Sequence, residues 1–72
     1  MRITHDPGAD ALSIELRPVQ PQDSIDLEDG VTADLGAEGH LVGIEVLDAS
    51  ERLGADALAS VAIERLPVSP SA

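Results

Sequence analysis

The sequence predicts an α+β domain, in which a small antiparallel β-sheet of about five strands, built as a meander of β-hairpins, packs with one short C-terminal helix. Three observations lead to this class. Apolar residues alternate with polar ones in five short segments, turn-forming residues separate the segments, and a helix-start signal follows the fifth. The domain is expected to span residues 1–66, and residues 67–72, rich in proline and serine, are expected to form a flexible tail.

Two alternating segments, residues 1–5 and 12–16, predict the first hairpin. The segment between them is dense in turn-forming residues. A four-residue loop, even in length, places Ile3 on the same face as Leu12 or Ile14, because side chains alternate between the two faces of a strand.

The third and fourth strands are predicted on either side of an Asp-Gly dipeptide. A two-residue turn there would split the apolar residues over both faces. A three-residue loop, Glu28–Gly30, pairs Leu27 with Val31 and keeps one face apolar. The same loop pairs Ile25 with Ala33, and its glycine takes the left-handed conformation of a G1 bulge.

The fifth strand is expected over residues 40–47, after an even loop that begins and ends in glycine. Its apolar residues on the shared face are Val42, Ile44 and Val46. Leu41 and Leu47 then fall on the opposite face. A helix or a second subunit is expected to cover them, so these two leucines are the candidate interface residues.

A helix is predicted to begin at Ala49, because Asp48 and Glu51 match a capping box, in which each side chain accepts the backbone amide of the other residue. Gly54 either ends a first short turn or lies inside one longer helix. Residues 61–66 return to alternation and are a candidate last strand.

The composition predicts a marginal core. The chain has 72 residues, no cysteine and no aromatic residue, so neither disulfides nor large ring side chains stabilise it. For a chain of this size, the free energy gained by burying apolar area nearly cancels the conformational entropy lost on folding. A homo-oligomer, and specifically a dimer, is therefore expected, because subunit contact buries additional apolar surface.

The charge narrows the classes of partner. Fourteen acidic residues against four arginines give a formal net charge of −10. Such a surface repels phosphate, which argues against nucleic-acid binding, and it suits either simple solubility or a basic protein partner. No segment is long and apolar enough to span a membrane. The first residues show strand-like alternation instead of the apolar core of a signal peptide, so a cytoplasmic location is expected.

The two histidines are the side chains best suited to metal binding or to acid–base chemistry near neutral pH. Each has carboxylates near it in sequence: Asp6 and Asp10 for His5, and Asp34 and Glu38 for His40. Two interpretations stay open. Either the histidines diverge on the surface, or they converge to form a metal site or an acid–base pair.

Another candidate group consists of the carboxylates Glu45, Asp48 and Glu51, which could bind a cation or an arginine of a partner. The structural interpretation is that the last two cap the helix, while Glu45 pairs with Arg52 or Arg17. Ser13 and Ser50 lack the sequence context of a catalytic nucleophile. The sequence therefore predicts no catalytic residue, no cofactor and no metal.

Several stretches of the sequence together resemble one known family. They are Asp6-Pro7, Asp10-Ala11-Leu12, Asp29-Gly30-Val31, Asp34, Gly39 and Val42–Ser50 with Arg52-Leu53. They resemble the small prokaryotic family called domain of unknown function 2283, over about residues 1–54, and Gly43–Ser50 is the most specific part. The family usually has aromatic residues where this chain has His5 and Ser13. The resemblance implies a compact β-rich fold with a helix and no established activity.

Two functional hypotheses follow. The first is a small acidic protein–protein interaction module that binds and neutralises a basic partner. The alternative is a small-molecule or metal-binding enzyme that uses His5 or His40 with the nearby carboxylates.

Overall fold

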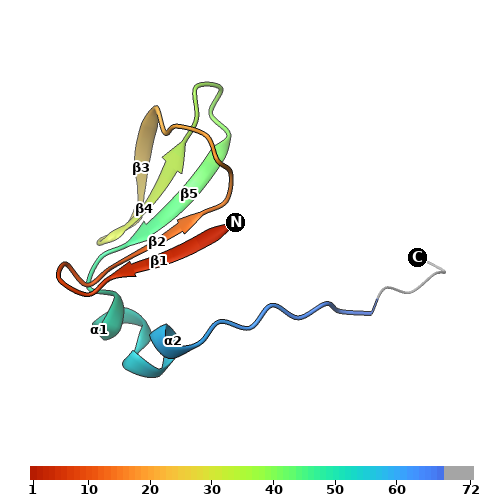
Figure 1. Ribbon diagram of the computed structural model, residues 1–72. Helices are drawn as coiled ribbons and strands as arrows, with labels where there is room; N and C mark the ends of the chain where they lie inside the picture. Colours follow the sequence, from red (N-terminus) through yellow and green to blue (C-terminus); the bar gives the residue numbers. More distant parts are fainter. Residues whose placement is uncertain (68–72) are drawn as a thin grey trace.

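The computed structural model of the protein describes residues 1–67 and confirms the α+β class (Figure 1). The elements are β1 (Arg2–Asp6), β2 (Ala11–Glu15), β3 (Asp23–Glu28), β4 (Val31–Leu35), β5 (Leu41–Val46), α1 (Ala49–Leu53) and α2 (Ala55–Ala59). The remainder of the predicted tail, residues 68–72, lies outside the described residues.

All five strands form one antiparallel sheet in the order β1-β2-β5-β4-β3. β1 and β2 form one hairpin, and β3, β4 and β5 form a short meander that joins it through the β2–β5 pair. The connection from β2 therefore crosses one end of the sheet before β3 begins (Figure 1). Backbone hydrogen bonds fix both ends of this crossing: Leu16 N–H donates to the carbonyl of Val42, and Gln22 N–H donates to the carbonyl of Leu35, each at 2.8 Å.

The strand register confirms that the predicted apolar residues share one face. Direct cross-strand neighbours form an unbroken row through all five strands: Ile3, Ile14, Ile44, Ala33 and Ile25. Cross-strand neighbours project to the same side of a sheet, so this row, called here the apolar row, marks the apolar face. The opposite face carries the polar residues that alternate with the row.

The β3–β4 turn differs in detail from the prediction. Ile25 pairs with Ala33 as expected, but Val31 pairs with Glu28 instead of Leu27. The turn is therefore the shorter one, and an irregularity between Asp26 and Glu28 restores the register that a short turn alone would have broken. The turn glycine, at position 30, has the expected left-handed conformation, with φ of 83°.

The C-terminal helical region is found where it was predicted, as two five-residue helices. Of the two alternatives for Gly54, the structure confirms that it ends the first helix, because it adopts φ 89° and ψ 147° between them. The prediction of a capping box at Asp48 is wrong. Asp48 has a left-handed backbone, with φ of 51°, whereas a capping residue normally has an extended one, and its side chain makes no capping hydrogen bond. Residues 61–66 form no strand and run outside the sheet.

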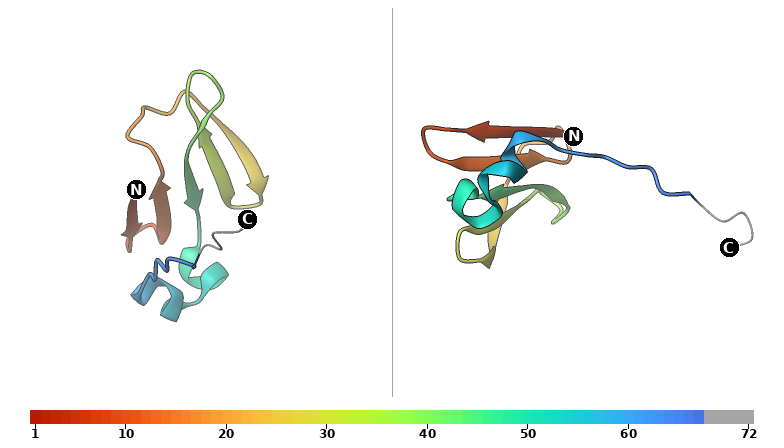
Figure 2. Two further views of the ribbon diagram at one scale, coloured as in Figure 1. Left: turned by 90° about the vertical axis from the view of Figure 1, so that its right-hand side faces the viewer. Right: turned by 90° about the horizontal axis from the view of Figure 1, so that it is seen from below.

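The helices lie beyond one end of the sheet and leave most of its apolar face open (Figures 1 and 2). At the β1–β2 hairpin, Leu58 and Val61 line a cavity of about 430 Å³ together with Ile3 and Ile14. The helices contact each other far more than they contact any strand. Among the described residues, the buried hydrophobic ones are Ala33, Val42, Val46 and Ala49. Ile25 at the end of the apolar row remains 49% exposed. The predicted packing of a helix on the sheet is therefore limited to the contact at the sheet's end.

Candidate functional site

The two histidines do not converge. His5 lies on β1 opposite Leu12, near the β1–β2 turn, whereas His40 directly precedes β5. Because β2 and β5 are antiparallel, the start of β5 lies at the opposite end of the sheet from that turn. The two side chains line different cavities, so the shared two-histidine site has no geometric basis.

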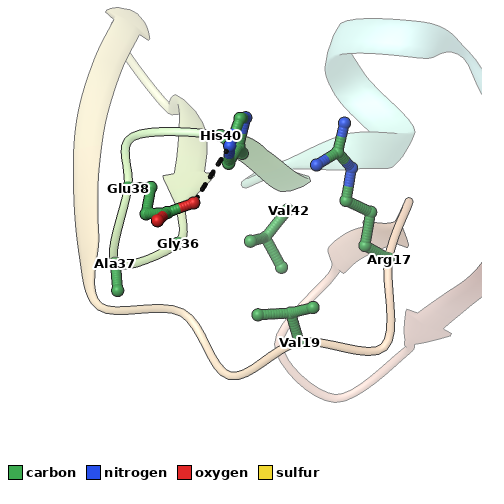
Figure 3. Close-up of a pocket in the computed structure, with 7 residues that line it drawn as sticks. All are labelled: Arg17, Val19, Gly36, Ala37, Glu38, His40 and Val42. Atoms are coloured by element: carbon green, nitrogen blue, oxygen red, sulfur yellow. Dashed lines mark ion pairs between the residues drawn. The ribbon is translucent and has the colours of Figure 1, made fainter.

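His40 borders a surface cavity of about 320 Å³ (Figure 3). The lining residues are Arg17, Val19, Gly36, Ala37, Glu38, His40 and Val42. Figure 3 shows Val19 and Val42 facing each other, with Arg17 and His40 at the margin. His40 pairs with Glu38 at 3.5 Å, and both side chains are more than half exposed. The cavity thus has an apolar floor and a water-exposed charged rim, without a nucleophile beside the histidine.

His5 belongs to a three-residue cluster that brings together β1, the β1–β2 turn and α1. One carboxylate oxygen of Asp10 accepts the hydroxyl of Ser50 at 2.6 Å, and the other lies 2.9 Å from His5 Nε2. The carboxylate, not the imidazole, occupies the centre of this arrangement. A hydrolytic triad needs the histidine next to the serine, where it can accept the hydroxyl proton. This Ser–Asp–His order is therefore unsuited to nucleophilic catalysis.

Asp10 instead caps α1 from a distant part of the chain. Its carboxylate accepts the backbone N–H of Ser50 at 3.2 Å, and its carbonyl oxygen accepts the N–H of Ala49 at 2.9 Å. These interactions satisfy amides at the start of a helix, which have no partner within the helix. Hydrogen bonds from Ser50 and then His5 stabilise the charged form, so they lower the pKa of Asp10 below its ordinary value of 3.8. In the sequence, Asp10 stands out only as a carboxylate near His5.

Arg52 fixes the other side of the same junction. Its Nε donates to the carbonyl oxygen of Leu47 at 2.9 Å, and its guanidinium lies 3.6 Å from the carboxylate of Glu28. The guanidinium also packs over Gly30, where an added Cβ would lie 2.7 Å from Cζ of Arg52. The predicted pairing of Arg52 or Arg17 with Glu45 is therefore absent from the ion pairs of residues 1–67.

Glu45 lies beside another carboxylate. It is on the polar face of β5, and Asp34 occupies the diagonal position on neighbouring β4. A hydrogen bond with Asp34, followed by partial burial and charge repulsion from Asp34, raises the pKa of Glu45 above its ordinary value of 4.5. The polar face therefore presents two adjacent carboxylates, and ionisation of one makes ionisation of the other less favourable.

The structure leaves both candidate interface leucines accessible: Leu41 is 38% exposed and Leu47 is 53% exposed. A register shift between Asp34 and Leu35 places Leu41 directly opposite Leu35, which shares a face with the apolar row by alternation. Leu41 was expected on the polar face, and the shift changes that assignment. Leu47 lies in the bend between β5 and α1.

Neither a metal centre nor a transmembrane helix is found in the part of the chain that the structure describes. Within residues 1–67, no three histidine, aspartate or glutamate side chains lie close enough together to hold a metal ion. No helix in the same range has the length and apolar character needed to cross a bilayer.

Comparison with protein families matches residues 2–50 to the family described as Protein of unknown function (DUF2283). The matched range covers the whole sheet and ends at Ser50, the residue bound by Asp10. Searches of curated proteins and of solved structures found no significant match.

Proposed function

This chain belongs to the DUF2283 family of proteins of unknown function, and from its own geometry we propose that it is a small acidic protein–protein interaction module. The observation that carries the proposal is that the helices lie at one end of a five-stranded sheet and leave most of its surface available for contact (Figure 2). Few of the described residues are buried, so much of the molecule's surface consists of sheet side chains that a partner can reach.

The polar face suits a basic partner. Glu45 and Asp34 are adjacent there, and the pKa of Glu45 is raised first by its hydrogen bond with Asp34, then by partial burial, and least by the charge repulsion between the two carboxylates. An arginine or lysine from a partner would relieve it, since a nearby positive charge favours both carboxylates in their ionised form. The net charge of −10 would further accelerate encounter with a basic protein. We infer that such a partner binds over β4 and β5.

A salt-dependent pull-down tests this function. The tagged chain is expected to capture a basic protein from native lysate at about 0.05 M NaCl and to release it at about 0.5 M, because salt screens charge attraction. The Asp34→Asn/Glu45→Gln double variant should retain less of that protein. Asp56→Asn/Glu51→Gln removes the same charge from the helices and should behave like the parent chain.

Two results would contradict the proposal: the absence of any salt-sensitive basic partner, or equal losses with both double variants. The alternative of an enzyme built on His5 or His40 gains no support from the geometry. His5 is engaged by the carboxylate of Asp10, and His40 pairs with Glu38 on an exposed rim.

A further inference from the structure

We propose that the apolar row binds a second copy of this chain, so that two sheets pack face to face with their acidic faces outward. This inference goes beyond the proposed function, which concerns a basic partner on the opposite face. It rests on three features of the described residues: the continuity of the row, its exposure, and the distribution of charge around it.

The apolar row is continuous across the full width of the sheet. Ile3, Ile14, Ile44, Ala33 and Ile25 are successive cross-strand neighbours, and a parallel row brings Leu12, Val46 and Val31 beside them. Only Ala33 and Val46 of these eight residues are buried. In a β-sandwich, the same kind of surface is covered by a second sheet about 10 Å away. One sheet of this molecule therefore resembles half of a sandwich.

A face-to-face dimer needs most of the apolar row in the contact. A standard interface buries about 800 Å² on each partner. Most of the row is only partly buried in the single chain: Ile25 is 49% exposed, and Leu41 on the same face is 38% exposed. These side chains are the apolar surface that a second copy would cover.

The arrangement of charge favours a second copy over the basic partner at this face. Two chains of net charge −10 repel each other, so they associate most readily through a surface that is poor in carboxylates. The apolar row itself contains no carboxylate, and Glu15, Asp34 and Glu45 lie on the other face by strand alternation. Two acids share the apolar face only at its β3 edge: Asp23 opposite Leu35, and Glu28 opposite Val31, where Glu28 pairs with Arg52. In a face-to-face dimer, these acidic faces lie on opposite outer surfaces, where their mutual repulsion is weakest.

Association through the β3 edge of the sheet is less suitable. The edge strand β3 carries three acidic residues, at positions 23, 26 and 28, and charged side chains on an edge oppose the addition of another strand. The apolar row carries no charged side chain of this kind. A two-fold axis through that face pairs the same row with itself, as a symmetric homodimer requires.

Sedimentation velocity and light scattering on the full chain test the proposal. The expected mass is 14.8 kDa, which is twice the 7.4 kDa of one chain. The dimer should persist at high salt, because burial of apolar surface is not screened. A mass of one chain at every concentration up to about 200 µM, above the dissociation constants of stable dimers, would overturn the proposal, as would a dimer that dissociates when salt is added.

A matched pair of variants locates the interface. Ile25→Lys places a charge at the end of the apolar row and should weaken the dimer at least tenfold. Ser24→Lys adds the same charge one residue earlier, on the polar face opposite Asp34, and should leave the dissociation constant within about threefold of the parent value. Equal effects of the two variants, or a larger effect of Ser24→Lys, would place the interface elsewhere.

The concentration dependence of thermal unfolding distinguishes a variant that fails to associate from one that fails to fold. The melting temperature of a dimer rises with protein concentration. That dependence should be present in the parent chain and in Ser24→Lys, and it should be absent from Ile25→Lys. Because Ile25 is half exposed in one chain, its replacement should leave the β-sheet circular dichroism intact. If the chain is monomeric but still binds a basic protein, the dimer proposal is refuted and the proposed function stands. If the chain is dimeric but captures no basic protein, the proposed function is refuted and the dimer proposal stands.

Discussion

At the scale of single residues, Asp10 connects the β1–β2 turn, β1 and α1 through its hydrogen bonds. Its left-handed backbone ends the β1–β2 turn, its carbonyl oxygen accepts Ala49 N–H, and its carboxylate binds Ser50 and His5. The sequence predicts a helix cap directly before the helix, at Asp48, because capping signals are local. A cap supplied from 40 residues away has no local signal, so it could be found only in the fold.

Asp10→Asn is expected to destabilise the protein. The amide that replaces one carboxylate oxygen cannot accept a hydrogen bond, and the negative charge near the helix start is lost. Since folding lowers the pKa of Asp10, the parent chain's advantage should be complete above about pH 3.8. It should then be lost as the pH falls through the lower pKa of the folded state. Urea unfolding at several pH values measures this difference.

Asp26→Asn is the control for that experiment, because Asp26 lies on β3, away from both helix starts, and its side chain takes part in no hydrogen bond or ion pair among residues 1–67. It should leave the urea midpoint almost unchanged. If Asp10→Asn were equally harmless at neutral pH, the assigned role of Asp10 as a cap would be incorrect.

Glu45 should show the opposite pH dependence. Its pKa is raised in the folded state, so the ionised form opposes folding, and this penalty is present at neutral pH and absent below about pH 4.5. Glu45→Gln should therefore stabilise the chain at pH 7, by about 0.2–1 kcal/mol as for other adjacent like charges. The gain should disappear on acidification. Matched unfolding curves of Glu51→Gln should show no such gain at pH 7, and a gain of equal size there would disprove the assignment to Asp34.

At the scale of elements, the strands were predictable and their irregularities were not. Period-2 alternation identified all five strands, because one face of each must be more apolar than the other. The shifts beside Leu27 and Leu35 were missed, since a bulge inserts a residue without changing the local composition. The second shift is the reason that Leu41 was assigned to the wrong face.

Gly43 is the position where the central strand pair is most vulnerable. A Cβ added there would lie 2.6 Å from the backbone oxygen of Ile14, so alanine must push β5 away from β2. Gly43→Ala should cost about 1–3 kcal/mol, as overpacking does elsewhere. Hydrogen exchange should accelerate at the amides of the β2–β5 pair.

Gly39→Ala is the comparison for Gly43→Ala. An added Cβ meets nothing within 4 Å at Gly39, so that variant tests the left-handed backbone alone, with φ of 81°. It should leave exchange in the β2–β5 pair unchanged. Equal acceleration in both variants would show that the close approach of Gly43 to Ile14 is not what holds the pair.

At the scale of the whole molecule, composition anticipated the incomplete core. A chain without aromatic residues or disulfides was expected to bury too little of its own surface, and the described core consists of two valines and two alanines. The arrangement of the strands was harder to predict. The placement of β5 between β2 and β4 depends on the crossing of residues 16–22 over the sheet's end, and no alternation pattern encodes that path.

The distant cap at Asp10 also has a consequence for the order of folding. A five-residue helix is too short to nucleate by itself in water, and α1 receives its N-terminal acceptors only after the first β-turn has formed and approached it. We therefore expect α1 to form late, once the chain from residue 10 to residue 50 has closed into a loop. On this expectation, the helical signal of α1 reports completion of the sheet rather than its initiation.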